Sequence, residues 1–245
     1  MKKYDWLARL TAWVEKKLSR FVKTIIFNAQ FSRIYYGSIG YRLRNAVVIP
    51  NGIDTDVFKP SLDSRVATRH QLGIPPDALV VGMLARVDSM KDYETYLTAA
   101  RALCANYKNL YFIAAGMGTD IASWNSVPTR FLGLGVREDV SGLLNALDIM
   151  VLCSFGEGFP NVIGEAMACG IPTIATDVGD VAYIVDNLGI VIPPKNHEAL
   201  IQAIKSLLHQ TPSKEDLRNR ILTNFSVPQM VDQTLHVLSD AYASS

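Results

Sequence analysis

The chain has 245 residues, of which 49% are hydrophobic and 19% are charged, and its 24 basic and 23 acidic side chains leave a net charge of +1. This apolar share is enough for a packed core, which excludes a disordered or fibrous chain, and the near-neutral charge argues against binding to nucleic acid. The longest segment without a charged residue has 11 residues, about half of the ~20 that a membrane-spanning helix needs.

The cysteines and the N-terminus indicate the compartment. The three cysteines form no CxxC pair, and their odd number leaves one thiol without a possible partner. Charged residues interrupt the N-terminal segment from Lys2 onward, so no signal peptide is predicted. Both features favour a reducing compartment, and we expect a cytoplasmic protein.

Residues 1–27 carry seven Lys or Arg against two acidic residues, a net charge of +5. Apolar residues recur there at steps of three and four, which predicts one amphipathic helix over residues 4–26. These residues are Trp6, Leu10, Val14, Leu18, Phe21, Val22 and Ile25. We expect this helix to pack against protein. The alternatives are peripheral contact with the anionic inner face of a membrane, or with a partner subunit.

After residue 27, short apolar segments alternate with helical patterns. Strands are predicted at 46–49, 78–84, 109–115, 129–132, 148–153, 171–175 and 188–192. Helices are predicted near 62–72, 92–107, 137–147, 160–169 and 180–187, and from 196 to the end. Strands buried on both faces and separated by helices predict an α/β fold with a doubly wound parallel sheet, Rossmann-like in type. The segment 50–61 is predicted to be an irregular linker.

Ligands of such sheets bind at the carboxyl ends of the strands, so the residues after each predicted strand are candidates for a site. Arg86 and Lys91 follow the strand at 78–84. Two cations on one loop can converge on the oxygens of a phosphate, although a solvated loop also explains two charges.

A second candidate follows the strand at 148–153. Gly156 and Gly158 allow a tight loop there, and Pro160 fits the start of a helix whose free N–H groups would face the same cleft. Glu157 lies in the loop, and Glu165 lies about a turn and a half into the helix. A carboxylate accepts two hydrogen bonds, which suits the diol of a ribose or another sugar.

Other motifs are absent. Gly116 and Gly118 follow a predicted strand, but Ile121 stands where the GxGxxG motif needs its third glycine, which argues against NAD. No P-loop motif is present, and the histidines lack metal-ligand spacing, so we expect neither a metal nor a cofactor. The histidines are His70, His197, His209 and His236.

Four segments, in this order, resemble the family 4 retaining glycosyltransferases of the GT-B fold. They are VVIPNGIDTDVFKP at 47–60, VGMLARVDSMKD at 81–92, FLGLGVREDV at 131–140 and EGFPNVIGEAMACGIPTIATDVGD at 157–180. The last holds the E-x7-E signature of that family, and the segment FSVPQMVDQTLHVL at 225–238 is similar to its closing helix.

The resemblance implies that the chain is the C-terminal half of a GT-B enzyme. Residues 1–45, with the basic helix and a strand near 24–29, would be the end of the N-terminal, acceptor-side domain. Residues 46–224 would form the nucleotide-sugar-binding Rossmann-like domain, and residues 225–245 the closing helix. Most of the acceptor-side domain has no counterpart in this sequence.

The resemblance also implies a role for each charged candidate. Arg86 and Lys91 would bind the diphosphate of a nucleotide-sugar donor, and their charge would take the place of a metal ion. Glu165 would bind the ribose hydroxyls. Glu157 would be the catalytic residue, because it would hold the donor sugar close to the anomeric carbon.

Further contacts would come from the backbone. The N–H groups of Phe159, Asn161 and Val162 would contact sugar and phosphate, and Leu134 would lie beside the nucleobase.

The implied reaction transfers a sugar from a UDP-, GDP- or ADP-sugar to a glycan or a lipid-linked acceptor, without a metal and with retention of the anomeric configuration. One alternative is a nucleotide-sugar-binding module that is inactive without a separate acceptor-side domain or subunit. Another is a sugar-nucleotide epimerase, which shares the GT-B architecture but lacks the E-x7-E loop.

Overall fold

A computed structural model describes residues 5–120 and 128–243. Its main domain contains a six-stranded parallel sheet with the order β5-β4-β3-β6-β7-β8. The strands are β3 (Leu79–Leu84), β4 (Leu110–Ala115), β5 (Phe131–Gly133), β6 (Ile149–Leu152), β7 (Thr173–Thr176) and β8 (Ile190–Ile192). The predicted doubly wound parallel sheet is therefore confirmed.

The strand order locates the place where a ligand is expected. The chain passes from β3 to β4 and β5 on one side, and then crosses to β6, β7 and β8 on the other. Because the crossovers on the two sides leave in opposite directions, a crevice opens between the carboxyl ends of β3 and β6. Arg86 and Lys91 follow β3, and the loop with Glu157 follows β6.

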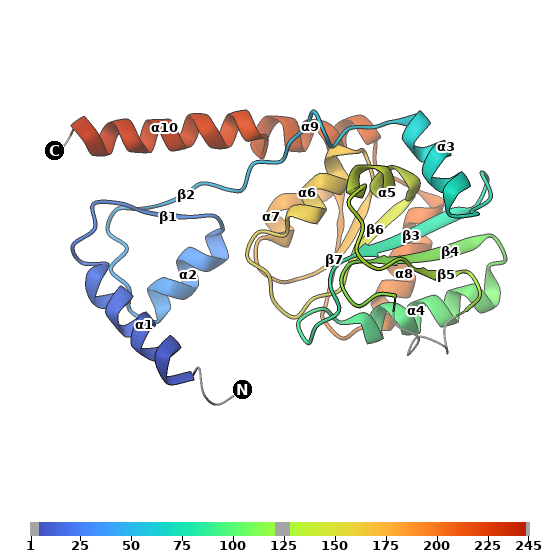
Figure 1. Ribbon diagram of the computed structural model, residues 1–245, viewed down its shortest axis with the longest axis horizontal. Helices are drawn as coiled ribbons and strands as arrows, with labels where there is room; N and C mark the ends of the chain where they lie inside the picture. The colour runs from blue at the N-terminus through green and yellow to red at the C-terminus, as the bar shows by residue number, and fades with distance from the viewer. Residues whose placement is uncertain (1–4, 121–127, 244–245) are drawn as a thin grey trace.

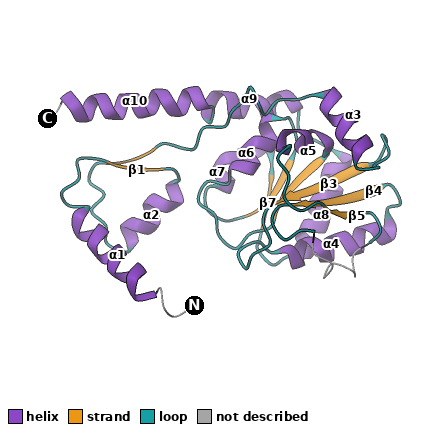
Figure 2. Ribbon diagram, in the orientation of Figure 1, coloured by secondary structure: helices purple, strands orange, loops and turns teal. Residues whose placement is uncertain are grey.

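Helices cover both faces of the sheet (Figures 1 and 2). On one face, α4 (Tyr93–Asn106) and α8 (His197–His209) pack on each other and on the strands through a core that contains Tyr96, Leu103 and Leu200. The other face carries α5 (Val140–Ala146), α6 (Asn161–Ala168) and α7 (Val181–Val185), which a short 3-10 turn at Asp186–Leu188 follows. Outside these, α3 (Leu62–Gln71) packs on α5, and α9 (Lys214–Asn224) packs on α6.

A smaller N-terminal unit lies apart from the main sheet (Figure 1). It consists of α1 (Asp5–Leu18), β1 (Ile25–Phe27), α2 (Gln30–Ser38) and β2 (Ala46–Val48). The strands β1 and β2 pair in parallel with each other and form their own two-stranded sheet.

This unit corrects two sequence predictions and adds one helix. The strand predicted at 46–49 is not part of the main sheet, because β2 pairs with β1. The helix predicted over 4–26 ends at Leu18, so Phe21 and Val22 lie in a turn and the loop after it; Tyr4 lies outside the described residues. The strand predicted near 24–29 is confirmed by β1. The helix α2 was not predicted.

The last helix, α10 (Val227–Ala243), extends from the main domain along the N-terminal unit (Figure 1). The linker before α3 and the start of α10 hold each other, because the Ile53 N–H donates to the Phe225 carbonyl at 2.7 Å and the Val227 N–H donates to the Ile53 carbonyl at 3.1 Å. Near the far end of α10, Lys23 Nζ donates to the Ala241 carbonyl at 2.5 Å. The C-terminal helix thus joins the two parts.

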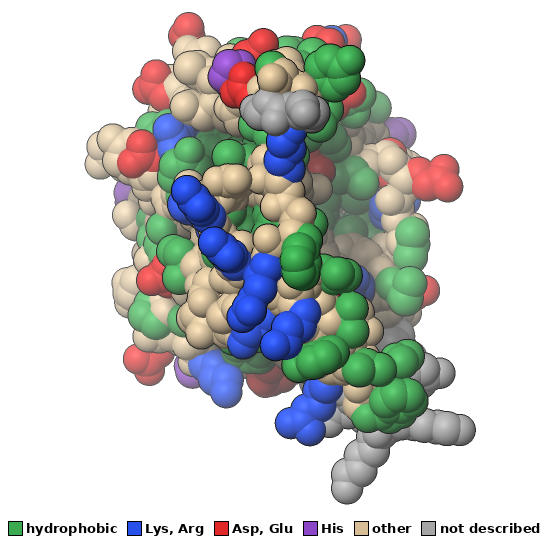
Figure 3. Space-filling view, turned by 90° about the vertical axis from the view of Figure 1, so that its left-hand side faces the viewer, with side chains coloured by type: hydrophobic (Ala, Val, Ile, Leu, Met, Phe, Trp, Pro, Cys, Tyr) green, Lys and Arg blue, Asp and Glu red, His purple; other side chains and the backbone are tan. Residues whose placement is uncertain are grey.

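The outer face of the N-terminal unit is both basic and apolar. Figure 3 shows a band of Lys and Arg side chains with hydrophobic side chains beside it. Trp6, Trp13 and Phe21 are exposed by 64%, 58% and 84%. A hollow of about 190 Å³ is lined by four cations, Arg20, Lys23, Arg42 and Arg44. Within residues 5–120 and 128–243, no helix has the length and hydropathy that a membrane span requires.

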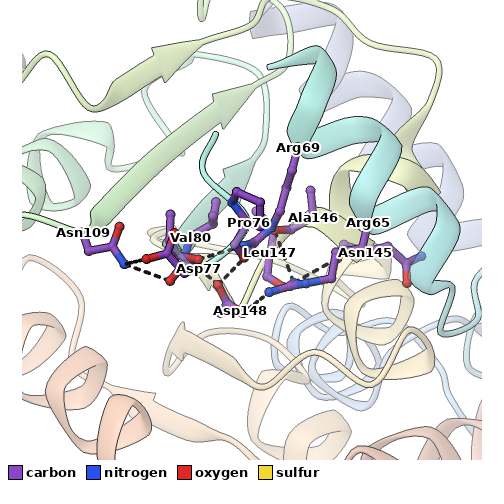
Figure 4. Close-up of polar contacts among 11 residues, drawn as sticks. Arg65, Arg69, Pro76, Asp77, Val80, Asn109, Asn145, Ala146, Leu147 and Asp148 are labelled. Carbon is purple, nitrogen blue, oxygen red and sulfur yellow. Dashed lines mark hydrogen bonds and ion pairs between the residues drawn. The ribbon is translucent and has the colours of Figure 1, made fainter. Parts of the chain in front are cut away.

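A partly buried ionic cluster lies at the amino ends of β3 and β6 (Figure 4). This cluster, the Asp148 cluster, consists of Arg65 and Arg69 from α3 and Asp148 just before β6. Arg65 Nη2 lies 2.6 Å from Asp148 Oδ1, and Arg69 Nη2 lies 2.7 Å from Oδ2. Arg69 is 3% exposed, and it also donates to the carbonyls of Ala146, Pro76 and Ala78. It therefore fixes α3 to the end of α5.

Candidate functional site: a pocket at the carboxyl end of the sheet

A pocket of about 320 Å³ opens at the crevice beside the carboxyl ends of β3 and β4. It brings together four of the predicted site residues, Arg86, Asn161, Val162 and Glu165. The remaining lining residues are Leu84, Ala85, Ala115, Gly116, Val136, Arg137, Val140 and Leu143. Its wall is thus mostly apolar, with two guanidinium groups and one carboxylate, and it has the size and mixed character of a small-molecule site.

The close approach of two backbones forms one side of this pocket. Gly116, which ends β4, has a φ of +136°, and a Cβ there would lie 2.3 Å from the Ala85 carbonyl oxygen. The Val87 N–H donates to the Met117 carbonyl at 2.8 Å and ties the loops after β3 and β4 together. A side chain at position 116 would separate the two loops, so the glycine serves this contact rather than a dinucleotide motif. Ile121, the third position of that motif, lies outside the described residues.

Glu165 contributes the only carboxylate of the pocket's lining. It projects from α6 between buried residues such as Ile163 and Ala166, and its side chain is itself half-buried. Burial raises the pKa of Glu165 above its ordinary value. Within the described part of the chain, no hydrogen bond or ion pair reaches this carboxylate to offset that cost. An unpaired, partly buried carboxylate in a pocket is typical of a group that awaits a ligand.

Arg86 follows β3 and is 69% exposed. Its Nε lies 2.5 Å from Asp88 Oδ2, and this hydrogen bond, with the Met90 N–H as a second donor, holds the pKa of Asp88 below its ordinary value. The guanidinium is therefore held at the edge of the pocket by a neighbour in its own loop, with most of its donors toward solvent.

Lys91 and Glu157 form an ion pair at the other side of the crevice. Both side chains are less than a fifth exposed, and the Ser154 hydroxyl also donates to Glu157 Oε1 at 2.7 Å. The backbones on either side are joined as well, because the Phe155 N–H donates to the Met90 carbonyl at 2.9 Å. In this structure Lys91 is paired with Glu157 and does not line the pocket. A phosphate site shared by Arg86 and Lys91 would require both side chains to face the same pocket. The predicted diphosphate role of Lys91 stays a prediction.

The start of α6 presents backbone donors to the pocket. Asn161 and Val162 are its first two residues and line the pocket. The first N–H groups of a helix have no partner within it, and within the described residues these two have none elsewhere. The Phe159 side chain is 7% exposed and packs against Phe225 in the core. Only its backbone can serve a ligand.

Leu134 lies just after β5 and is half-buried in the core beside the pocket, but it is not one of the lining residues. Its N–H donates to the Ala114 carbonyl at 2.9 Å. Its carbonyl is the backbone group left for the predicted contact with a nucleobase.

Arg137 was not singled out from the sequence, although it lines the pocket. Its Nε and Nη2 donate to both oxygens of Asp139, at 2.8 and 2.7 Å, and this pairing raises the pKa of Arg137 further. The rule that found Arg86 also applies to Arg137, which stands four residues after β5, a strand that ends at the same edge of the sheet as β3.

Comparison with known proteins finds matches over most of the chain. The family model described as "Glycosyl transferases group 1" matches residues 64–223. An Escherichia coli UDP-Gal:alpha-D-GlcNAc-diphosphoundecaprenol alpha-1,3-galactosyltransferase is 28% identical over 207 residues, which cover 76% of this chain and 52% of that protein. A putative glycosyltransferase of Bacillus subtilis, EpsF, is 27% identical over 71% of this chain and 47% of its own length. The chain thus spans about half the length of these relatives.

Solved structures share the fold. HepE from Anabaena, solved in complex with UDP-glucose, superposes with a TM-score of 0.84 at 24% identity, over 95% of this chain and 68% of HepE. A sucrose-phosphate synthase from Thermosynechococcus elongatus gives a TM-score of 0.83 at 23% identity, over 97% of this chain and 63% of that one. At these identities the likeness establishes the fold alone, which is that of GT-B glycosyltransferases.

Proposed function

Since the chain belongs to the glycosyl transferases group 1 family, we propose that its pocket binds the nucleoside diphosphate part of a nucleotide-sugar donor. The observation that carries the proposal is the half-buried, unpaired carboxylate of Glu165 in a pocket that also holds Arg86 and Arg137. A ribose diol would give Glu165 the two donors it lacks, and a diphosphate would meet the guanidinium groups and the N–H groups at the start of α6.

The donor sugar would then extend from the diphosphate toward Glu157. This carboxylate accepts from Lys91 and Ser154, so it keeps lone pairs for the hydroxyls of a sugar. We propose that Glu157 is the catalytic residue, which holds the sugar while the bond from its anomeric carbon to the diphosphate oxygen breaks.

In that step the electron pair leaves with the diphosphate, and the acceptor oxygen forms the new bond to the same carbon. The acceptor hydroxyl gives its proton to the departing diphosphate. We propose that the anomeric configuration is retained and that Arg86 and Lys91, rather than a metal ion, stabilise the charge that develops. The acceptor would be a glycan or a lipid-linked sugar, as the name of the E. coli relative suggests.

Calorimetry with UDP, GDP and ADP, each with and without EDTA, tests the donor site. We expect at least one nucleotide to bind equally well in both conditions, and loss of all binding in EDTA would contradict metal independence.

Two variants distinguish the residue that binds the nucleotide from the residue that binds the sugar. Glu165→Gln is expected to weaken UDP binding, whereas Glu157→Gln should leave UDP within about twofold and weaken only UDP-sugars. Equal losses of UDP would show that the roles are wrongly assigned.

A second candidate function is a donor-binding module that needs a separate acceptor side. The observation that favours it is the small N-terminal unit, in which two strands pair only with each other within the described chain and the apolar side chains of α1 stay exposed. Positioning the acceptor can contribute about 7–11 kcal/mol of barrier reduction. We therefore expect the 245-residue chain to bind donors without completing a transfer. Acceptor-dependent release of UDP at ordinary enzymatic rates would contradict this. The family match is to transferases, which argues against the epimerase alternative.

The exposed face of α1 would be covered by further acceptor-side structure, because Trp6 and Trp13 are large and apolar and lie beside a very short sheet.

Contact of residues 1–27 with a membrane stays a prediction, as does the cytoplasmic location. Residues 1–4 lie outside the described chain. The basic hollow at Arg20 and Arg44 makes the membrane alternative testable. Binding to anionic vesicles at low salt but not at high salt would favour it, and equal recovery with neutral vesicles would exclude it.

A further inference from the structure

Helix α2 begins without a cap of its own. The residue before it, Ala29, has no side-chain acceptor, and its first turn contains no acidic residue. Instead, Asp180 from the main domain supplies both acceptors. Its Oδ2 accepts the Gln30 N–H at 2.7 Å, and its Oδ1 accepts the Phe31 N–H at 2.8 Å. N–H groups at a helix start need such partners, and these come from a residue 150 positions away in the sequence.

Asp180 stands at the position that would cap its own helix, α7, yet its carboxylate makes no bond there. The side chain is turned toward the N-terminal unit, and the residue is 4% exposed. A buried carboxylate is costly unless it is paired, and the two N–H groups of α2 offset that cost. The Asp180 carboxylate therefore connects the main domain to the N-terminal unit.

The backbone of the same segment holds the loop that carries Glu157. The Asp180 N–H donates to the Gly158 carbonyl at 2.9 Å. Gly179 has a φ of +58°, and a Cβ there would lie 2.3 Å from the Glu157 carbonyl oxygen. Asp180 therefore touches the Glu157 loop through its backbone and α2 through its side chain.

The start of α2 also lies against this loop directly. Ala29 is fully buried in the same core cluster as Phe159. A Cβ on Gly158 would lie 3.6 Å from Ser32 Oγ and 3.9 Å from Ala29 Cβ. The loop residue Gly158 is thus enclosed by the Asp180 segment and the first turn of α2.

We infer that Asp180 is a positioning residue that couples the N-terminal unit to the donor-sugar loop by capping α2. When the cap is made, α2 and the Glu157 loop occupy one fixed arrangement. When it is lost, both move, and the sugar end of the donor site loosens while the nucleotide end stays intact. The effect on ligands rests on the proposed function, but the coupling itself is a property of the ligand-free chain.

Two variants remove the contact from opposite sides. Asp180→Asn keeps the shape and one acceptor but loses the charge. Gln30→Pro removes one of the two donors, and it suits the site because proline is favoured at the first position of a helix and Ala29 is already extended, at φ −148° and ψ 142°. The matched control is Asp177→Asn, which changes an exposed carboxylate in the same segment.

Hydrogen exchange of the ligand-free chain measures the coupling. In Asp180→Asn we expect the Phe31 amide to exchange about tenfold faster. In Gln30→Pro, which changes no residue of the Glu157 loop or of the Asp180 segment, we expect faster exchange in residues 155–159. The double variant should be no worse than the more affected single variant. Unchanged protection of residues 155–159 in Gln30→Pro would overturn the inference.

Calorimetry with UDP and UDP-glucose extends the test to the site. Both variants should weaken UDP-glucose about fivefold or more and leave UDP within twofold, while Asp177→Asn changes neither. Equal loss of both ligands, together with a lower melting temperature, would show a merely structural role and overturn the inference. If the unmodified chain binds neither ligand, the proposed function fails, and the exchange data still decide the coupling.

Discussion

The two ends of the main sheet differ in whether their charged side chains have partners within the chain. At the amino end, the Asp148 cluster pairs the buried Arg69 with an aspartate, and the Nε and Nη1 groups of this arginine donate to carbonyls. At the carboxyl end, Lys91 and Glu157 are paired with each other, but inside the pocket Glu165 has no partner in the described chain and Arg86 turns most of its donors to solvent. Charged groups that are paired within the chain stabilise the fold, whereas a charged group left unpaired in a pocket can still bind a ligand. The groups that stabilise the sheet and those available to a ligand thus lie at opposite ends of it.

The largest expected effect comes from the amino end. Arg69→Met keeps the volume but removes one of the donors to Asp148, which keeps Arg65 and the Val80 N–H. It also leaves the three carbonyls that Arg69 binds without this donor, so we expect a loss of about 3–5 kcal/mol of stability. For a chain of this size the melting temperature should fall by roughly 10 °C. Binding of UDP below that temperature should not change. Calorimetric scans and titrations measure both.

Arg65→Met is the matched comparison. Arg65 pairs with the same carboxylate, but its side chain is 24% exposed, so water can replace part of what it donates. It should therefore cost clearly less than Arg69→Met. Similar costs would show that burial of Arg69 is not what makes the cluster important.

Arg86→Ala tests the opposite end and should have the opposite character. Losing charge-assisted hydrogen bonds to a diphosphate is expected to weaken UDP by about 1.5–3 kcal/mol, which is roughly 10- to 150-fold. The melting temperature should stay within about 1 °C, because the exposed pair with Asp88 contributes little. Lys108→Ala removes an exposed cation on the loop after α4 and serves as the control. Equal loss of UDP affinity in both variants would show only a general charge effect.

The sequence predicted the carboxyl end well and the amino end hardly at all, for a physical reason. Loops after buried strands meet at one edge, so Arg86 and Glu165 could be placed together from the strand pattern alone, whereas Lys91 and Glu157, predicted at the same edge, lie outside the pocket. Arg65 and Arg69 are one helical turn apart, a spacing typical of a solvated helix face, and their partner Asp148 lies about 80 residues away. No local pattern marks such a pair.

The N-terminal unit was predicted least well for a related reason. Helix α2 has neither an N-terminal cap nor a buried residue of its own, so the usual signals of a helix start are missing. Its cap is Asp180, which only the folded chain brings near. The apolar spacing of residues 6–25 continued past Leu18 into a turn and a strand, because periodicity alone does not show where a helix ends.

Glu165→Gln should move stability and binding in opposite directions. Because burial raises the pKa of Glu165, its charge opposes folding at neutral pH, and the neutral amide is expected to stabilise the ligand-free chain by about 0.5–2 kcal/mol. The gain is full above the raised pKa and shrinks as the pH falls through it toward the ordinary value of 4.5, below which the carboxyl is protonated in both states. Melting temperatures measured between pH 4 and 8 test this.

The same variant should bind UDP more weakly, since the amide oxygen accepts less strongly than a carboxylate. A destabilised Glu165→Gln, or a stability gain that does not depend on pH, would mean that this carboxyl has a structural partner. The pocket would then hold no unpaired carboxylate, and the two ends of the sheet would no longer differ in this respect.

The smallest expected effect concerns the one exception at the amino end. Thr173, the first residue of β7, is fully buried, and its hydroxyl has no hydrogen-bond partner within the described chain. Thr173→Val replaces the hydroxyl by a methyl group of the same shape, so we expect a gain of up to about 1 kcal/mol. Thr176→Val is the matched control at the carboxyl end of the same strand, where the hydroxyl accepts the Ser154 N–H at 2.9 Å and donates to the Ser154 carbonyl at 2.8 Å. It should cost about 1–3 kcal/mol, because it leaves the base of the Glu157 loop unsatisfied. Denaturant unfolding measures both, and a loss in Thr173→Val as large as that in Thr176→Val would show that the two hydroxyls have similar surroundings after all.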